Sequence, residues 1–222
     1  MKITLLGQAG ILLQTARTAV LADPYFTDSA FGVSGIHRRI PVPESVWDIK
    51  PDVVLFTHDH IDHYDPETAA RFINEKTRVT VLSPRSVWEK VRENGGGNEY
   101  VLVSPDVAWT HGDTEITAVK AAHSDPYAVG FVIAAEGKRV YITGDTLYFN
   151  GVRLPFESVD CVFLPINGRG NNMNVCDASR FASQVNAKHA VPIHYGMLDD
   201  IDPRTFEYNG RVIMEYFKEY EI

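Results

Sequence analysis

The stretch Thr57-His58-Asp59-His60-Ile61-Asp62-His63 holds three histidines and two aspartates within seven residues. A short apolar block, Val53-Val54-Leu55-Phe56, precedes it and predicts a buried β-strand. Helix-start signals follow it, with Asp65 as an N-cap and Pro66 at the first helical position. The motif is therefore expected in a tight loop at a strand end, where several side chains can face one point.

The spacing of this motif suits metal binding, because neutral imidazole and carboxylate are ligands that Zn²⁺ and similar divalent metals accept. His58 and His60 can face one metal, while Asp62 and His63 can turn to a second. The alternative is a polar loop with surface histidines. That interpretation leaves the concentration of ligand-type residues unexplained.

Three further ligand candidates each follow an apolar, strand-like segment. Taken alone, each is more commonly an ordinary loop residue, but together they repeat one pattern of strand and then ligand. A carboxylate among them can bridge two cations that would otherwise repel each other. The three are His123, Asp145 and His194, after strands predicted at Glu115–Ala121, Arg139–Ile142 and Ala190–Ile193. The pattern predicts a two-metal centre that activates water for hydrolysis.

From Gly7 to Gly196 the chain resembles the metallo-β-lactamase superfamily, which has the same H-x-H-x-D-H motif, a later His, a strand-end Gly-Asp and a final His. The resemblance implies an α/β fold, a four-layer αββα sandwich. It also implies the ligand sets: His58, His60 and His123 for metal one, Asp62, His63 and His194 for metal two, and Asp145 between them. Asp62 is further expected to help move a proton during catalysis.

Asp23, within Leu21-Ala22-Asp23-Pro24, matches the early strand-end Asp of this family. The resemblance implies that it supports the ligands from behind, where such a partner fixes the tautomer and orientation of a histidine. The alternative is a plain turn before Pro24.

The sequence around the motifs resembles one branch of the superfamily, that of L-ascorbate-6-phosphate lactonase and the related N-acyl-phosphatidylethanolamine phospholipase D group. Thr143-Gly144-Asp145-Thr146 and Pro165-Ile166-Asn167-Gly168-Arg169 carry this resemblance, although the early Gly-His pair of the family is Gly7-Gln8 here. Asn167 and Arg169 are the predicted substrate-binding residues, because a guanidinium offers a planar fork for phosphate or carboxylate. The alternative is a solvated polar turn.

The predicted function is metal-dependent hydrolysis of a small ester-like substrate, first a sugar-phosphate lactone and then a phosphodiester. Two divalent metal ions are expected, Zn²⁺ first, with Mn²⁺ or Fe²⁺ as alternatives. The alternative functions are a mononuclear iron dioxygenase of the same fold and a nuclease-type phosphodiesterase. A non-catalytic structural zinc site is a weaker alternative, because such sites are usually closed, four-ligand and rich in Cys.

Composition is typical of a globular enzyme, with 222 residues, 45% hydrophobic and 23% charged. We expect one domain over residues 1–222. The net charge of −8 argues against nucleic acid as a partner, since that binding depends on Lys and Arg. Two cysteines without framework spacing indicate a reducing compartment, and hence a cytoplasmic protein. No membrane partner is expected. The expected partner is a small, anionic substrate, and a homo-oligomer is left open.

The remaining patterns predict elements around the motifs. Tyr25–Ser45 is a long irregular stretch of the kind that often forms a lid, and Pro203–Ile222 is left open between helix and strand. Asp177 is the predicted cap of the last helix, and a hairpin is expected at Ala135-Glu136-Gly137-Lys138. Further strands are predicted at Ile3–Leu6, Ile11–Thr15, Val20–Ala22, Val79–Leu82, Tyr100–Val103, Val129–Ala134 and Cys161–Leu164, and helices at Pro66–Asn74, Arg85–Asn94 and Ala178–Asn186.

Overall fold

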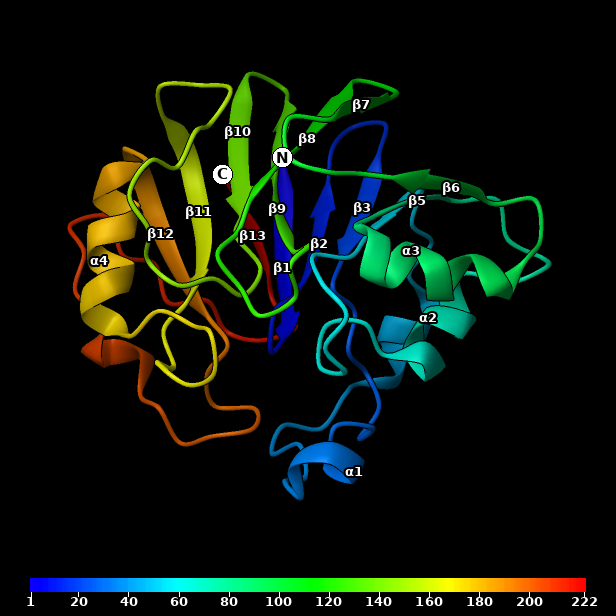
Figure 1. The fold of residues 1–222 in the computed structure, drawn as a ribbon, viewed down its shortest axis with the longest axis horizontal. Coiled ribbons are helices and arrows are strands. Elements are labelled where there is room, and N and C mark those ends of the chain that lie inside the picture. Colours follow the sequence, from blue (N-terminus) through cyan, green and yellow to red (C-terminus); the bar gives the residue numbers. More distant parts are fainter.

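Two β-sheets face each other in the computed structural model, which describes residues 1–222 (Figure 1). The first sheet has the order β13-β1-β2-β3-β4-β5-β6 and the second the order β12-β11-β10-β9-β8-β7. The strands of the first are β1 (Lys2–Gly7), β2 (Gly10–Gln14), β3 (Ala19–Ala22), β4 (Val53–Leu55), β5 (Thr80–Ser83), β6 (Glu99–Leu102) and β13 (Glu219–Glu221). Those of the second are β7 (Ala108–His111), β8 (Thr114–Lys120), β9 (Val129–Ala135), β10 (Lys138–Ile142), β11 (Val159–Pro165) and β12 (Ala187–Ile193).

Helices cover the outer face of each sheet. The α-helices are α1 (Phe31–Ser34), α2 (Pro66–Phe72), α3 (Arg85–Val91) and α4 (Val175–Gln184), and the 3-10 turns are η1 (Glu44–Asp48), η2 (Arg92–Asn94) and η3 (Pro203–Thr205). α2 and α3 share one apolar cluster with the first sheet, α4 shares another with the second, and a third fills the space between the sheets. The predicted four-layer αββα sandwich is therefore confirmed. None of the helices has the length and apolar character that crossing a membrane requires.

Strand direction explains why the predicted ligands converge. β3 to β6 run parallel, as do β10, β11 and β12, and β8 has the direction of β10 because β9 is antiparallel to both. The carboxyl ends of parallel strands share one edge, where ligands of such sheets usually lie. The segments after β3, β4, β8, β10 and β12 therefore meet at one end of the sandwich.

Local sequence accounts for most elements. β4 is buried along its whole length, as its unbroken apolar run predicts for a parallel strand covered on both faces. Asp65 caps α2 by accepting a hydrogen bond from the Glu67 backbone N–H, as predicted. The hairpin between β9 and β10 is confirmed by the pairing of Ala135 with Lys138.

Three features differ from the sequence prediction or extend it. Asp177 as the cap of α4 is wrong: Asn174 caps it, because its side chain accepts from the backbone N–H groups of Cys176 and Asp177. The short, half-exposed β7 was not predicted. The tail Pro203–Ile222 is neither one helix nor one strand: it begins with the 3-10 turn η3 and ends with the short β13, which pairs antiparallel with β1.

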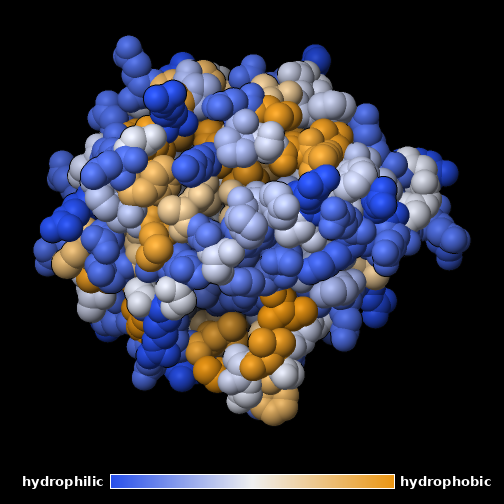
Figure 2. All heavy atoms as spheres, in the orientation of Figure 1, coloured by the Kyte–Doolittle hydropathy of each residue, from blue (hydrophilic) through white to orange (hydrophobic).

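The segment predicted as a lid contains α1 and η1. α1 buries none of its side chains and stands away from both sheets (Figure 1). Phe31, Val33 and Ile36 are exposed there, and Figure 2 shows apolar surface over this projection.

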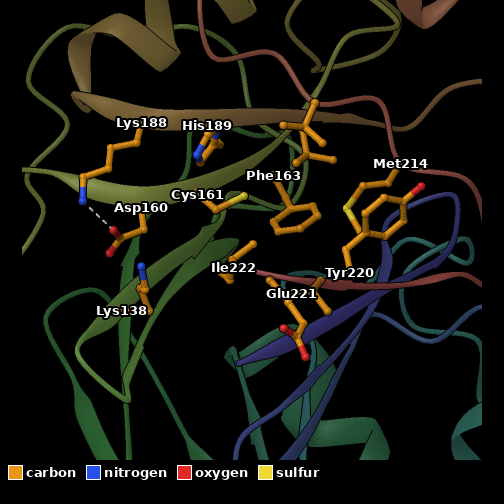
Figure 3. A pocket seen from close by; sticks show the side chains of 13 residues that line it. Lys138, Asp160, Cys161, Phe163, Lys188, His189, Met214, Tyr220, Glu221 and Ile222 are labelled. Carbon is orange, nitrogen blue, oxygen red and sulfur yellow. Dashed lines mark hydrogen bonds and ion pairs between the residues drawn. The ribbon is translucent and has the colours of Figure 1, made fainter.

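A cavity of about 230 Å³ opens between β13 and the strands β10 to β12 (Figure 3). Cys161, Phe163 and Met214 give it an apolar lining, and charged residues near the starts of β10, β11 and β12 lie at its border. It therefore lies at the opposite end of the sandwich from the predicted ligands, and none of them lines it.

Candidate metal centre

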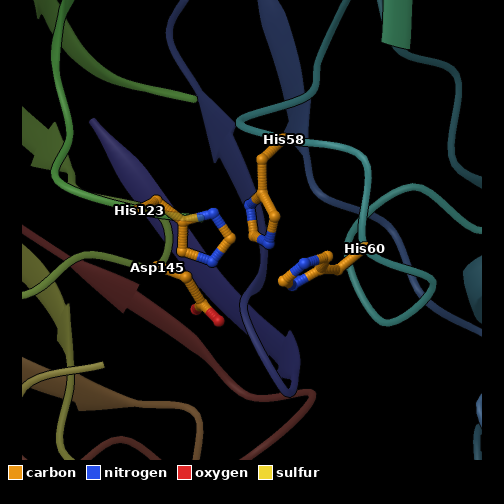
Figure 4. Close-up of side chains that lie close together, drawn as sticks. All are labelled: His58, His60, His123 and Asp145. Atoms are coloured by element: carbon orange, nitrogen blue, oxygen red, sulfur yellow. The ribbon is translucent and has the colours of Figure 1, made fainter. Parts of the chain in front are cut away.

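The seven predicted ligands lie together as two groups, and within each group the ligand atoms all lie within 4.8 Å of one another. The first group comes from the loops after β4, β8 and β10 (Figure 4). The second combines the loop after β4 with the end of β12. The first group is His58, His60, His123 and Asp145, and the second is Asp62, His63 and His194.

Asp145 connects the two groups. Its Oδ1 lies 3.1 Å from Nε2 of His63, and its Oδ2 lies 3.2 Å from Nε2 of His194. With metal–ligand bonds of about 2.0–2.2 Å, two atoms on one metal ion lie roughly 3–3.5 Å apart. Asp145 belongs to the first group and lies within this distance of two ligands of the second, so it could serve both groups if metal ions were bound.

Unpaired buried atoms test whether these residues fit metal ions. Nε2 of His58, Nε2 of His63 and Oδ1 of Asp145 are buried and form no well-aligned hydrogen bond, although the last two atoms lie 3.1 Å apart as an ion pair. Buried polar atoms nearly always have a hydrogen bond, so Nε2 of His58 lacks a partner, and the His63–Asp145 pair has ligand atoms that a cation could satisfy. Imidazole nitrogens and carboxylate oxygens are donors that Zn²⁺, Mn²⁺ and Fe²⁺ accept. The residues present fit two divalent metal ions.

A hydrogen-bond chain behind the centre presents two of the histidines. Nδ1 of His63 donates to Oδ2 of Asp23 at 2.8 Å, and the hydroxyl of Thr57 donates to the same oxygen at 2.6 Å. Nδ1 of His58 lies 3.0 Å from that hydroxyl, which can accept its proton. Protons held on Nδ1 leave Nε2 of both rings free as ligand atoms. A plain turn at Asp23 does not account for these contacts.

The side chains around the two groups include two that sequence reasoning missed. Nε2 of Gln8 donates to Oδ2 of Asp62 at 2.7 Å, and Nδ2 of Asn172 donates to Oδ2 of Asp145 at 2.8 Å. Both residues stand in segments that the sequence singled out, the Gly7-Gln8 departure and the loop after β11. Nothing in the sequence of either segment indicates which predicted metal ligand its side chain contacts.

The two predicted substrate-binding residues are placed differently. Nδ2 of Asn167 lies 2.9 Å from Nδ1 of His194, so this side chain contacts a predicted ligand. Arg169 lies two residues further on, is exposed, and forms no ion pair. The structure therefore brings Asn167, but not Arg169, into contact with the predicted ligands.

The first group faces solvent more openly than the second. His60 is exposed and His123 is half-buried, whereas His63 and His194 are buried. Solvent therefore reaches the first group past His60 and His123.

The pKa values of the buried histidines depend on the charges of the carboxylates beside them. Burial acts to lower the pKa of His63, but the carboxylates of Asp145 and Asp23 outweigh it and hold that pKa well above its usual range. In the same way, Asp145 and Asp62 overcome burial and raise the pKa of His194 to about 10. The buried carboxylates thus attract positive charge, which protons supply in the metal-free protein and a metal dication can supply instead.

Metal loading near neutral pH is therefore expected to release protons from His63 and His194. Because the pKa of His194 is raised to about 10, metal affinity should increase as the pH rises toward that value. In the metal-free protein the raised pKa stabilises the fold fully below pH about 6.5, and this contribution is lost as the pH rises. Calorimetric titration with Zn²⁺ in buffers of different ionisation enthalpy measures the release. A binding enthalpy independent of the buffer would contradict it.

Comparison with known proteins agrees with this geometry. The model of the beta-lactamase superfamily domain matches residues 18–195, which include all seven predicted ligands. A UPF0173 metal-dependent hydrolase of Ligilactobacillus salivarius is 32% identical over 209 residues, which cover 90% of this chain and 88% of the relative.

Two solved structures share the fold. A metallo hydrolase from Ignicoccus hospitalis has a TM-score of 0.78 and 19% identity, covering 100% of this chain and 98% of that chain. CmlA, a diiron β-hydroxylase from Streptomyces venezuelae, has a TM-score of 0.67 and 17% identity, covering 91% of this chain and 48% of that chain. The superfamily resemblance read from the ligand motif is confirmed by the family match: this chain belongs to the β-lactamase superfamily and is a relative of its UPF0173 proteins.

Proposed function

We propose that this protein is a metal-dependent hydrolase that cleaves a small, anionic, ester-like substrate with a metal-activated hydroxide. The observation that carries the proposal is the convergence of the buried ligand atoms of His58, His63 and Asp145, with Asp145 a member of the first group and 3.1–3.2 Å from two histidines of the second. The UPF0173 relative from Ligilactobacillus salivarius bears the name metal-dependent hydrolase, which supports the same class of reaction.

The residues divide the work of such a reaction. The two ligand groups would hold divalent metal ions, whose chemistry would be to lower the pKa of a bound water toward neutrality and to polarise a substrate oxygen. Burial acts to raise the pKa of Asp62, but its hydrogen bond to His194 and the charge of His63 hold it below its usual range. Asp62 is thus ionised near neutral pH and can take the proton of the attacking water and pass it to the leaving oxygen.

The substrate we place first is a sugar-phosphate lactone, followed by a phosphodiester. The support is the loop Pro165-Ile166-Asn167-Gly168-Arg169, with its resemblance to the ascorbate-6-phosphate lactonase branch and its solvent-facing Arg169. The net charge of −8 counts against a nuclease, because nucleic-acid affinity rests on Lys and Arg. Small molecules therefore remain the proposed partners.

The second candidate function is an iron-dependent oxidation. CmlA, which carries the name diiron β-hydroxylase, has a similar fold. A shared four-layer fold therefore does not determine which reaction a protein catalyses. Metal analysis of the purified protein, combined with a screen of lactones, phosphodiesters and thioesters, tests both candidates. Stoichiometric iron with oxygen uptake and no hydrolysis would reject the hydrolase.

Arg169 is expected to bind the anionic group of the substrate. A charge-assisted hydrogen bond of this kind contributes about 1.5–3 kcal/mol, so Arg169→Ala should raise KM for a phosphorylated substrate roughly ten- to a hundredfold. Arg169→Lys should recover only part of this, because an ammonium lacks the bidentate fork. Metal content should stay constant in both variants.

The matched control is Arg180→Ala. Arg180 is an exposed arginine on α4 that pairs with Asp177 of the same helix. Equal KM values for the parent, Arg169→Ala and Arg180→Ala would show that Arg169 is an ordinary solvated residue.

A further inference from the structure

We infer that the loop between β11 and α4 positions one ligand of each group: Asn167 accepts a hydrogen bond from His194 of the second group, and Asn172 donates one to Asp145 of the first. The inference rests on the proposed metal centre. It assigns opposite hydrogen-bonding roles to two amides that stand five residues apart in one loop.

The hydrogen-bonding role of Asn167 follows from the geometry of His194. Nε2 of this ring faces the other ligands, at 3.1 Å from Oδ2 of Asp62 and 3.2 Å from Oδ2 of Asp145. To serve as a ligand atom, Nε2 must keep its lone pair free, so the ring proton must sit on Nδ1. An N–H at Nδ1 needs an acceptor, because an unpaired buried donor costs about 1–3 kcal/mol.

Two amide side chains lie near Nδ1 of His194. Nδ2 of Asn167 is at 2.9 Å and Nε2 of Gln8 is at 3.2 Å, and the same Gln8 nitrogen also lies 3.0 Å from Nε2 of the ring. Gln8 must keep its nitrogen where it is, because that nitrogen donates to Asp62 at 2.7 Å. Asn167 is free to turn, since its Oδ1 is buried and has no partner. A rotation of 180° about its Cβ–Cγ bond brings Oδ1 to the Nδ1 proton.

Asn172 has the opposite role, that of a hydrogen-bond donor. Its Nδ2 donates to Oδ2 of Asp145 at 2.8 Å, in a buried environment. An ionised carboxylate only accepts hydrogen bonds, so no other orientation of this amide suits Asp145. The amide therefore holds the connecting carboxylate in place without adding charge.

The loop backbone keeps both amides in position. The Gly168 N–H donates to the Met173 carbonyl at 3.0 Å, and the Met173 N–H donates to the Thr146 carbonyl at 3.0 Å. The first contact closes the loop on itself, and the second ties it to the segment that carries Asp145. Gly168 has φ +62°, and a Cβ there would lie 3.0 Å from the Cβ of Asn174, so the closure favours glycine. Ligands supported by so constrained a loop lose little freedom on metal binding.

Two substitutions of equal charge separate the roles. Asn167→Asp keeps an acceptor for His194, so this variant should bind Zn²⁺ at least as tightly as the parent. Asn172→Asp places one carboxylate against another and should weaken Zn²⁺ binding about ten- to a hundredfold. Asn167→Leu removes the acceptor at similar volume and should weaken one equivalent of Zn²⁺ by a similar factor, leaving the other unchanged. Asn172→Asp should weaken both, since Asp145 touches both groups.

The measurement is competition of the full-length, metal-stripped protein with a chromophoric chelator for Zn²⁺, with thermal unfolding of each variant as the check on folding. If Asn167→Leu unfolds, the comparison of Asn167→Asp with Asn172→Asp still tests whether the two amides have opposite hydrogen-bonding roles. Equal shifts in the same direction for Asn167→Asp and Asn172→Asp would overturn the inference, because charge alone would then explain both. A parent that binds fewer than two Zn²⁺ ions would refute the proposed metal centre itself. Two ions in the parent with unchanged affinities in all variants would refute only the role of the loop.

Discussion

Replacing His60 by alanine is expected to lower hydrolysis by on the order of 10³-fold or more and to empty the first ligand group, while the metal-free protein unfolds at nearly the parent temperature. The large effect on activity follows from the loss of one of the four side chains of the first group. The small effect on stability follows because His60 is exposed and packs in none of the apolar clusters. Turnover, metal content per chain and thermal unfolding of the metal-free protein together check the prediction.

Asp59→Asn is the matched control, since Asp59 stands in the same motif. Its carboxylate pairs with the ammonium of Lys90 at 2.8 Å, and both side chains are partly exposed. Such pairs contribute little to stability, and this one is outside both ligand groups, so activity and metal content should stay close to those of the parent. Full metal occupancy and normal turnover in His60→Ala would rule out the assigned centre.

Asp23→Ala is expected to lower the free energy of unfolding by roughly 3–5 kcal/mol and metal affinity by about ten- to a hundredfold. Asp23 is fully buried and accepts three hydrogen bonds, two from Thr57 (2.8 and 2.6 Å) and one from Nδ1 of His63 (2.8 Å). Alanine would leave three buried donors unpaired and release the ring of His63 from its orientation. Denaturant unfolding of the metal-free protein and Zn²⁺ competition measure the two effects separately.

The comparison variant is Asp52→Ala. Asp52 also accepts a backbone N–H, from Ala19 at 2.8 Å, but it lies at the start of the β4 segment, away from the ligands. It should lose stability without a change in metal affinity. An Asp23→Ala variant that binds Zn²⁺ like the parent would show that Asp23 acts only as a turn.

Several parts of the fold and centre are predictable from the sequence because their signals are local. Most of the apolar block Val53–Phe56 forms the buried strand β4 (Val53–Leu55), and the ligands that follow must emerge at its carboxyl end. Asp65 and Pro66 start α2 through contacts within one turn of helix. His123, Asp145 and His194 were found by the same rule of strand and then ligand.

Other parts were not predictable because their partners are distant along the chain. Asn174 rather than Asp177 caps α4, since both residue types suit the position and only the backbone path of the loop selects one. The contact of Gln8 with His194 spans 186 residues, and that of Asn172 with Asp145 spans 27. The hydrophobic periodicity of a sequence does not reveal contacts between residues so far apart along the chain.

The sequence by itself thus determined which side chains are available as ligands and at which strand ends they stand. The direction of each loop side chain depends on which neighbouring strands bring their ends together, so only the tertiary structure decided that Asn167 turns to His194 while Arg169 turns to solvent. The same physical reason divides the ligands into two groups: the two sheets must face each other before Asp145, from the second sheet, can reach His63, from the first.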